Sequence, residues 1–237
     1  MTTRTDVDGR RRDLLARMVA ECEPGRADWA RAVSAVCVRA VAGVEGAALT
    51  LRSASRAQET LGASDPWASG LEEIHYTLGE GPAVEAFATG GPVLVADLRV
   101  DQVRWPVFAE AGTAVGVAAV FAFPLQVGGI RLGTLDLYRR RPGGLSSDAV
   151  TDALVLADVI TLALLQHTDR VGEDELHQVV SYQDVNMATG MLAAQLRVNL
   201  EDAFARLRAH AFATNRSVVE VAGDVLARRI PLDRLAG

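Results

Sequence analysis

Arginine is the residue type whose chemistry stands out in the last quarter of this chain. Residues 185–230 carry six arginines against four acidic residues, a net charge of +2, whereas the whole chain carries −6. The arginines are Arg197, Arg206, Arg208, Arg216, Arg228 and Arg229. Guanidinium groups form charge-assisted hydrogen bonds with phosphate. A mildly basic segment on an acidic protein permits selective binding of nucleic-acid phosphate and disfavours tight, sequence-blind binding.

The rest of the reactive side chains exclude several classes of enzyme. All 24 basic residues are arginine, so the chain has no lysine. P-loop nucleotide hydrolysis, protein-kinase chemistry and Schiff-base cofactors each depend on a lysine. The four histidines and the two cysteines, Cys22 and Cys37, show no metal-ligand spacing. We therefore expect no enzyme activity, no bound metal and no resident cofactor.

Three short helices are expected to position the arginines. The first covers residues 185–196. The second follows the N-cap residue Asn199, and its apolar residues recur on one helical face: Leu200, Ala203, Phe204, Leu207 and Ala211. The third opens with Ser217 and Glu220 at the spacing of a capping box. Such a bundle is typical of a binding or assembly module.

These segments resemble the ANTAR domain family in order and spacing. The matching pieces are Ala-Thr-Gly at residues 188–190, Glu-Asp-Ala-Phe-x-x-Leu-Arg at 201–208 and Val-x-Glu-Val-Ala at 218–222. The resemblance implies RNA binding and transcription antitermination. Thr189 stands where the family carries a lysine. A plain solvated face explains Arg206 and Arg216 as well as RNA does.

The resemblance and the basic side chains together mark a candidate RNA-binding set. It consists of Thr189, Gly190, Arg197, Arg206, Arg208, His210 and Arg216.

The middle of the chain alternates helix and strand patterns. Residues 121–127 and 130–138 predict a β-hairpin, because Gly128 and Gly129 supply the positive φ angles of a two-residue turn. In the second strand Thr134, Asp136 and Tyr138 share one face.

Three pieces of this region resemble the GAF domain family. They are Leu-Gly-Glu-Gly-Pro at residues 78–82, Gly-Pro-Val at 91–93 and Trp-Pro at 105–106. The resemblance implies a central antiparallel sheet with helices on one side and a ligand cleft on the other. Family members bind cyclic nucleotides, haem or bilins, or only dimerise, so the small-molecule ligand stays open. We expect the cleft to be lined by Trp67, Tyr76, Trp105 and Phe121.

A helical connection lies between the two parts. Near-heptad spacing predicts a helix that pairs with a second copy, through Val150, Leu154, Ala157, Thr161, Leu164 and Thr168. We expect a homodimer held mainly by residues 146–195.

The chain is thus expected to be an α+β protein. Its parts are an N-terminal helical extension (1–26), a GAF-like sensor domain (27–145), a helical coiled-coil linker (146–172) and an ANTAR-like three-helix output domain (173–237). No apolar run could span a bilayer, and the arginine-rich start lacks the apolar core of a secretory signal.

We therefore expect a cytoplasmic regulator that binds structured RNA, namely stem-loops in nascent transcripts, and neither membrane nor DNA. The alternative is a dimeric signalling scaffold whose GAF-like domain binds a small molecule and whose output bundle binds no RNA.

Overall fold

The computed structural model describes residues 9, 13, 15–22, 28–52, 58–168, 183–214 and 216–235. Its centre is a five-stranded antiparallel sheet in the order β2-β1-β5-β4-β3. The strands are β1 (Gly46–Arg52), β2 (Gln58–Ala63), β3 (Val93–Val95), β4 (Ala119–Val127) and β5 (Ile130–Arg139). An antiparallel sheet with helices on its faces is the α+β class that the sequence predicts.

The β4–β5 hairpin is confirmed, but only the first of its two turn glycines has the positive φ that was expected of both. Val127 pairs with Ile130 across Gly128 and Gly129, and Gly128 has a φ of 58°. The pairing continues to Ala119 and Arg139, with one irregularity after Leu125. This hairpin forms the middle of the sheet and carries residues of both cores.

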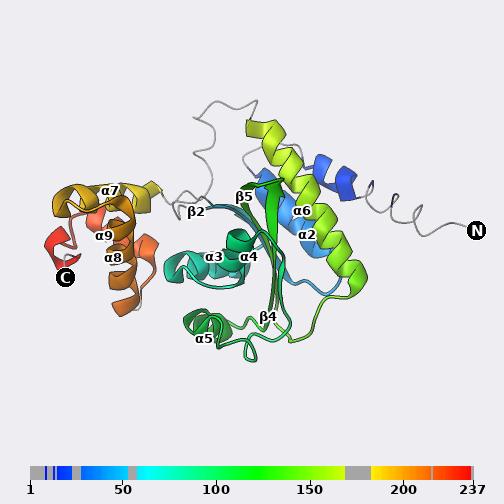
Figure 1. Ribbon diagram of the computed structural model, residues 1–237, viewed down its shortest axis with the longest axis horizontal. Coiled ribbons are helices and arrows are strands. Elements are labelled where there is room, and N and C mark those ends of the chain that lie inside the picture. The colour runs from blue at the N-terminus through cyan, green and yellow to red at the C-terminus, as the bar shows by residue number, and fades with distance from the viewer. Residues whose placement is uncertain are drawn as a thin grey trace, which may run out of the picture.

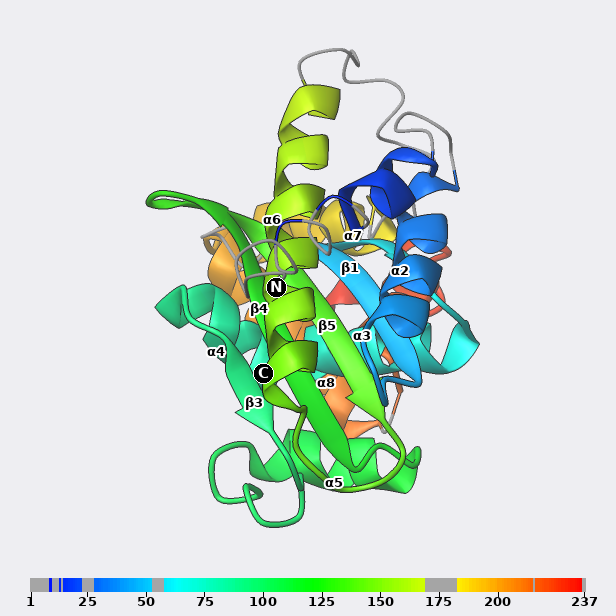
Figure 2. The same cartoon turned by 90° about the vertical axis from the view of Figure 1, so that its right-hand side faces the viewer.

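Helices cover both faces of the sheet (Figures 1 and 2). One face carries α2 (Trp29–Ala40) and α6 (Ser147–Thr168), and the other carries α3 (Pro66–Leu78), α4 (Pro82–Thr89) and α5 (Pro106–Ala114). Alternation along β4 sends Phe121 and Phe123 towards α2 and α6, and Val120 towards α3–α5. The expectation of helices on one side and an open cleft on the other was wrong, because each face supplies enough apolar side chains to bury helices.

The helix α6 lies on the sheet for much of its length. Leu156 and Ile160 are fully buried in the core beneath it, and Leu164 is 8% exposed. Of the expected seam for a second copy, Ala157, Thr161 and Leu164 are buried inside the protomer. Leu154 and Leu162, at 41% and 56% exposed, form the apolar part of the outer face of α6. Residues 169–172 of the predicted linker lie outside the described residues.

The C-terminal part is a bundle of α7 (Gln183–Leu196), α8 (Leu200–Ala213) and α9 (Val218–Leu226), closed by the 3₁₀ turn η2 (Leu232–Leu235). The cap at Asn199 is confirmed, since its side chain accepts a hydrogen bond from the Asp202 amide at 2.7 Å. The capping box of Ser217 and Glu220 is confirmed as well. The two caps fix where α8, which carries Arg206 and Arg208, and α9, which follows Arg216, begin.

The bundle lies beside α3, on the side of the sheet away from α2 and α6 (Figure 1). In the N-terminal stretch Leu15 and Val19 are buried in the core under α2 and α6. Within the described residues, no helix combines the length and apolarity needed to cross a membrane.

Candidate functional site

The candidate RNA-binding residues of α7 differ in how accessible they are. Thr189 is 7% exposed, and its hydroxyl donates to the Val185 carbonyl at 2.7 Å. A Cβ added at Gly190 would meet no atom within 4 Å, so the backbone there faces open space. Arg197 is exposed just after the helix and has a left-handed φ of 55°. Thr189 is thus the least accessible of the three, and its hydroxyl could donate to an RNA phosphate only by giving up the bond to Val185.

The helix α8 directs one candidate arginine at the sensor domain. The Nε of Arg208 donates to the Thr77 carbonyl at 2.8 Å, and a terminal guanidinium nitrogen donates to the Leu78 carbonyl. The guanidinium also lies over the Phe204 ring at 5.6 Å from its centroid. Arg206 and His210 are partly exposed on the same helix. The structure therefore separates Arg208 from the other candidates, because it faces the neighbouring domain.

Arg216, the last candidate, belongs to an ion-pair network of the bundle. It contacts Asp224 at 2.7 Å, and Arg229 contacts the other carboxylate oxygen of Asp224 at 2.7 Å. The hydrogen bond from Arg216 is the main reason why the pKa of Asp224 lies below its ordinary value. One carboxylate facing two guanidinium groups leaves positive charge at this end of the bundle. The RNA role of all seven candidates stays a prediction.

Beneath α3 the sensor domain buries a polar core that the sequence analysis did not identify. The Glu72 carboxylate accepts hydrogen bonds from Thr50, at 2.8 Å, and from the Tyr138 hydroxyl. Arg52 contacts the same carboxylate at 3.5 Å, and both side chains are almost completely buried. Burial, followed by the charge of Glu72, raises the pKa of Tyr138 well above its ordinary value. Tyr138 is thereby held as the neutral hydrogen-bond donor.

The same core contains side-chain atoms without partners. Asp136 accepts a hydrogen bond from Thr134 at 2.7 Å through one oxygen, and its other oxygen has no partner among the described residues. Burial and the charge of Glu72 raise the pKa of Asp136 well above its ordinary value. Gln58 and His75 also carry buried nitrogens without a partner in that part of the chain. Buried polar groups are normally satisfied, so these atoms are exceptional among the described residues.

His75 lies at the junction of the polar core and α5. Its ring stacks on Phe108 with centroids 4.1 Å apart. Burial lowers the pKa of His75 to about 4, from an ordinary 6.5. The imidazole is therefore neutral at pH 7. The one sequence clue to this core was the predicted strand face shared by Thr134, Asp136 and Tyr138. A carboxylate is seldom buried, yet Asp136 stands between two leucines in an otherwise apolar strand.

The four aromatic residues expected to line one cleft do not meet. Trp67 packs edge-on against Tyr138 at 6.1 Å and donates to the Val115 carbonyl. Trp105 is buried on the same side of the sheet. Phe121 faces α2 and α6 across the sheet, and Tyr76 is buried in the core of the C-terminal bundle. The four rings therefore do not line one cleft as expected. Strand alternation and the end of α3 place them in three separate cores.

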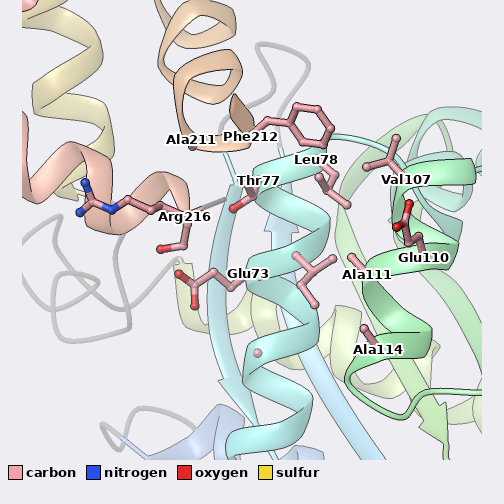
Figure 3. Close-up of a pocket in the computed structure, with 13 residues that line it drawn as sticks. Glu73, Thr77, Leu78, Val107, Glu110, Ala111, Ala114, Ala211, Phe212 and Arg216 are labelled. Atoms are coloured by element: carbon pink, nitrogen blue, oxygen red, sulfur yellow. The ribbon is translucent and has the colours of Figure 1, made fainter. Parts of the chain in front are cut away.

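A cavity of about 630 Å³ lies where the sensor domain meets the bundle (Figure 3). The sensor side contributes Glu73, Thr77 and Leu78 from α3, and Val107 and Glu110 from α5. The bundle contributes Ala211 and Phe212 from the end of α8, and Arg216 and Ser217, which precede α9. The volume is in the range of small-molecule sites.

The fold is an α+β domain joined to a C-terminal bundle of three helices. The sequence model described as GAF domain matches residues 26–165, and the one described as ANTAR domain matches residues 177–226. The chain therefore belongs to the GAF domain family, and it has the GAF–ANTAR architecture.

Solved structures support the fold. The GAF domain of a phosphoenolpyruvate-protein phosphotransferase from Acinetobacter is 14% identical, with a TM-score of 0.52 over 68% of this chain and 96% of that one. The corresponding domain from Coxiella burnetii is 13% identical, with a TM-score of 0.52 over the same shares. The chromophore-binding domain of a bacteriophytochrome from R. palustris is 12% identical, with a TM-score of 0.51 over 69% and 63%. No curated protein matches the chain.

Proposed function

We propose that this protein is an RNA-binding transcription antitermination regulator whose GAF domain controls its ANTAR domain. The observation that carries the proposal is the ANTAR match at residues 177–226. It falls on a well-capped three-helix bundle that bears a net positive charge within an acidic chain. ANTAR domains are RNA-binding domains of regulatory proteins, so a combined GAF and ANTAR architecture supports a regulatory role.

Arginine–phosphate contacts would provide the affinity. Arg197 is exposed, Arg206 is partly exposed, and Arg216 and Arg229 share a single carboxylate. Stem-loops are the proposed target, because loop bases are unstacked and readable while the deep major groove of A-form RNA is closed to side chains. Two bundles in a dimer would hold two stem-loops side by side.

The direct test is to purify the protein with its bound RNA and to sequence that RNA. Enrichment of transcript leaders with stem-loops, followed by gel-shift binding of those stem-loops, supports the proposal. Matched duplexes of the same length serve as the control and should bind more weakly. If the purified dimer binds no stem-loop at low salt, the antitermination function fails and the dimeric scaffold function takes its place.

The proposed site for the small molecule that controls the protein is the polar core beneath α3. Gln58, His75 and Asp136 keep buried atoms without partners, and a small polar ligand would satisfy them. Thermal-shift screening against cyclic nucleotides and small metabolites tests this. A ligand that raises the Tm of the wild type and not of Asp136→Asn supports it. No response across a broad panel favours a GAF domain with a purely structural role.

A further inference from the structure

The end of α3 offers hydrogen-bond acceptors to the bundle. The last carbonyls of a helix have no partner within the helix and carry partial negative charge. Here α3 ends at Leu78, and the carbonyls of Thr77 and Leu78 both accept from Arg208. A guanidinium that forks across two such carbonyls matches them in geometry and in charge. The contact therefore has the chemistry of a binding site for one arginine.

Two further contacts fix the bundle at the same point. The ring of Tyr76 packs against Phe204 with centroids 5.4 Å apart, and Tyr76 is only 3% exposed. Tyr76 is part of the apolar cluster of the bundle, although it belongs to the sensor domain. The Val218 amide lies 3.4 Å from the Thr77 hydroxyl. The last turn of α3 thus contacts both α8 and the start of α9.

Gly79 makes this approach sterically possible. It caps α3 with a φ of +64°, in the left-handed region that favours glycine. A Cβ at this position would overlap the guanidinium of Arg208. A side chain at residue 79 would therefore require the arginine to shift from its docked position.

We propose that docking of α8 on the end of α3 and binding of RNA by Arg208 exclude one another. The inference rests on the proposed function, since Arg208 is one of the candidate RNA-binding residues. In the docked state the Nε and one terminal nitrogen of Arg208 donate to backbone carbonyls, so an RNA phosphate could not pair with that edge of the guanidinium at the same time. The contact surface is the last turn of α3 with Gly79, and its occupant is α8 of the bundle.

The helix α3 also connects this surface to the polar core. Glu72 and His75 face the core from the second half of α3, and the next two residues, Tyr76 and Thr77, contact the bundle. A change in the core that shifts α3 would move both sets of side chains, because a helix transmits displacement as a rigid element. Ligand binding in the sensor domain can therefore bias docking without reaching the RNA face.

The test uses two full-length variants that open the contact from the sensor side, Gly79→Ala and Tyr76→Ala. The matched control is Gly90→Ala. Gly90 caps α4 with a φ of +73°, and a Cβ there would meet only the side chains of Gln126 and Arg131 within the sensor domain. The control thus applies the same backbone strain away from the bundle.

Two measurements are made on each protein. Hydrogen–deuterium exchange across residues 74–81 and 200–213 reports docking, and gel-shift titration with a stem-loop RNA reports affinity. In an opened variant exchange should rise in both segments and the apparent Kd should fall by about tenfold, the factor expected if about one wild-type molecule in ten is open. Stem-loop RNA should raise exchange in residues 74–81 of the wild type. Gly90→Ala should match the wild type in both measurements.

Several results would overturn the proposal. One is a variant whose exchange rises while its RNA affinity stays at the wild-type value. Another is RNA that binds the wild type and leaves exchange in residues 74–81 unchanged. A third is exchange that rises in neither variant, because the end of α3 would then not hold the bundle. If exchange rises and no protein binds RNA, docking stands while the proposed function and the exclusion by RNA both fail.

Discussion

The guanidinium of Arg208 lies 2.8 Å from the carbonyl oxygen of Thr77, although 131 residues separate them in the chain. This hydrogen bond joins a helix of the ANTAR match to the end of a helix of the GAF match. It gives the sensor domain a direct contact with a residue of the candidate RNA-binding set.

Exposed arginines of the bundle should set the salt dependence of RNA binding. Arg197→Ala and Arg206→Ala should each weaken stem-loop binding and lower the slope of log K against log salt by about one unit, because each removes a phosphate contact. Titrations at several salt concentrations measure the slope. Arg141→Ala is the control, since it removes an exposed arginine of the sensor domain. Equal slopes for all three variants would contradict a phosphate role in the bundle.

Thr189→Lys should strengthen RNA binding by restoring the charge that the family carries there. Thr189 is almost buried, so the lysine must extend its methylene stem along the bundle and place its ammonium in solvent. Gel shifts against the same stem-loop measure the gain. Thr189→Met is the matched control, because it has a similar length without charge. If the two variants bind RNA equally, the charge at residue 189 is not part of the RNA site.

The polar core should contribute to the stability of the sensor domain. Tyr138→Phe removes the hydroxyl that donates to Glu72 and leaves a buried carboxylate with fewer partners. The free energy of unfolding should fall by about 1–3 kcal/mol, the cost of an unsatisfied buried group. Urea denaturation measures it. A wild-type stability for Tyr138→Phe would show that this hydrogen bond contributes little.

The pH dependence of stability should report His75. Its pKa is about 4 in the folded protein and 6.5 ordinarily, so the unfolded chain binds this proton more readily. The contribution of His75 to the free energy of unfolding is therefore complete above pH 6.5 and is lost as the pH falls towards 4. Between these two pH values, this contribution should fall by about 1.4 kcal/mol for each pH unit.

His75→Phe keeps a ring against Phe108 and removes the proton site. In urea denaturation, the free energy of unfolding of this variant should rise relative to that of the wild type as the pH falls through that window. His210→Phe, at a partly exposed position of α8, is the control. Parallel curves for wild type and His75→Phe would show that His75 does not titrate between these values.

The outer face of α6 is where we expect a second copy to bind. Leu154→Glu and Leu162→Glu together should produce monomers in light scattering, because both side chains are exposed and apolar. Leu164→Glu is unsuitable for this test, since Leu164 is buried within the protomer. Ile130→Glu, at the exposed tip of the hairpin and 68% accessible, is the control. A dimer that survives the double substitution would place the interface on another surface.

Much of the local structure was readable from the sequence. Asn199, Ser217 with Glu220, and Gly128 with Gly129 each act on backbone groups within about four residues, so their spacing alone predicts where helices and turns begin. The order of motifs along the chain likewise identified both domain families. Alternation in β5 grouped Thr134, Asp136 and Tyr138 correctly, because strand periodicity is also a local property.

The partners of those residues were decided only by tertiary structure. Glu72 meets Tyr138 across 66 positions and Arg208 meets Thr77 across 131, and no local pattern encodes which distant group a side chain will meet. The same reason explains why the sequence analysis assigned Phe121 to a ligand cleft and Leu164 to a seam between two copies. Phe121 and Leu164 were placed correctly in a strand and in a helix, but the face that each turns to the core depends on how the sheet is covered. Periodicity determines which residues share a face, whereas packing against distant elements determines what that face contacts.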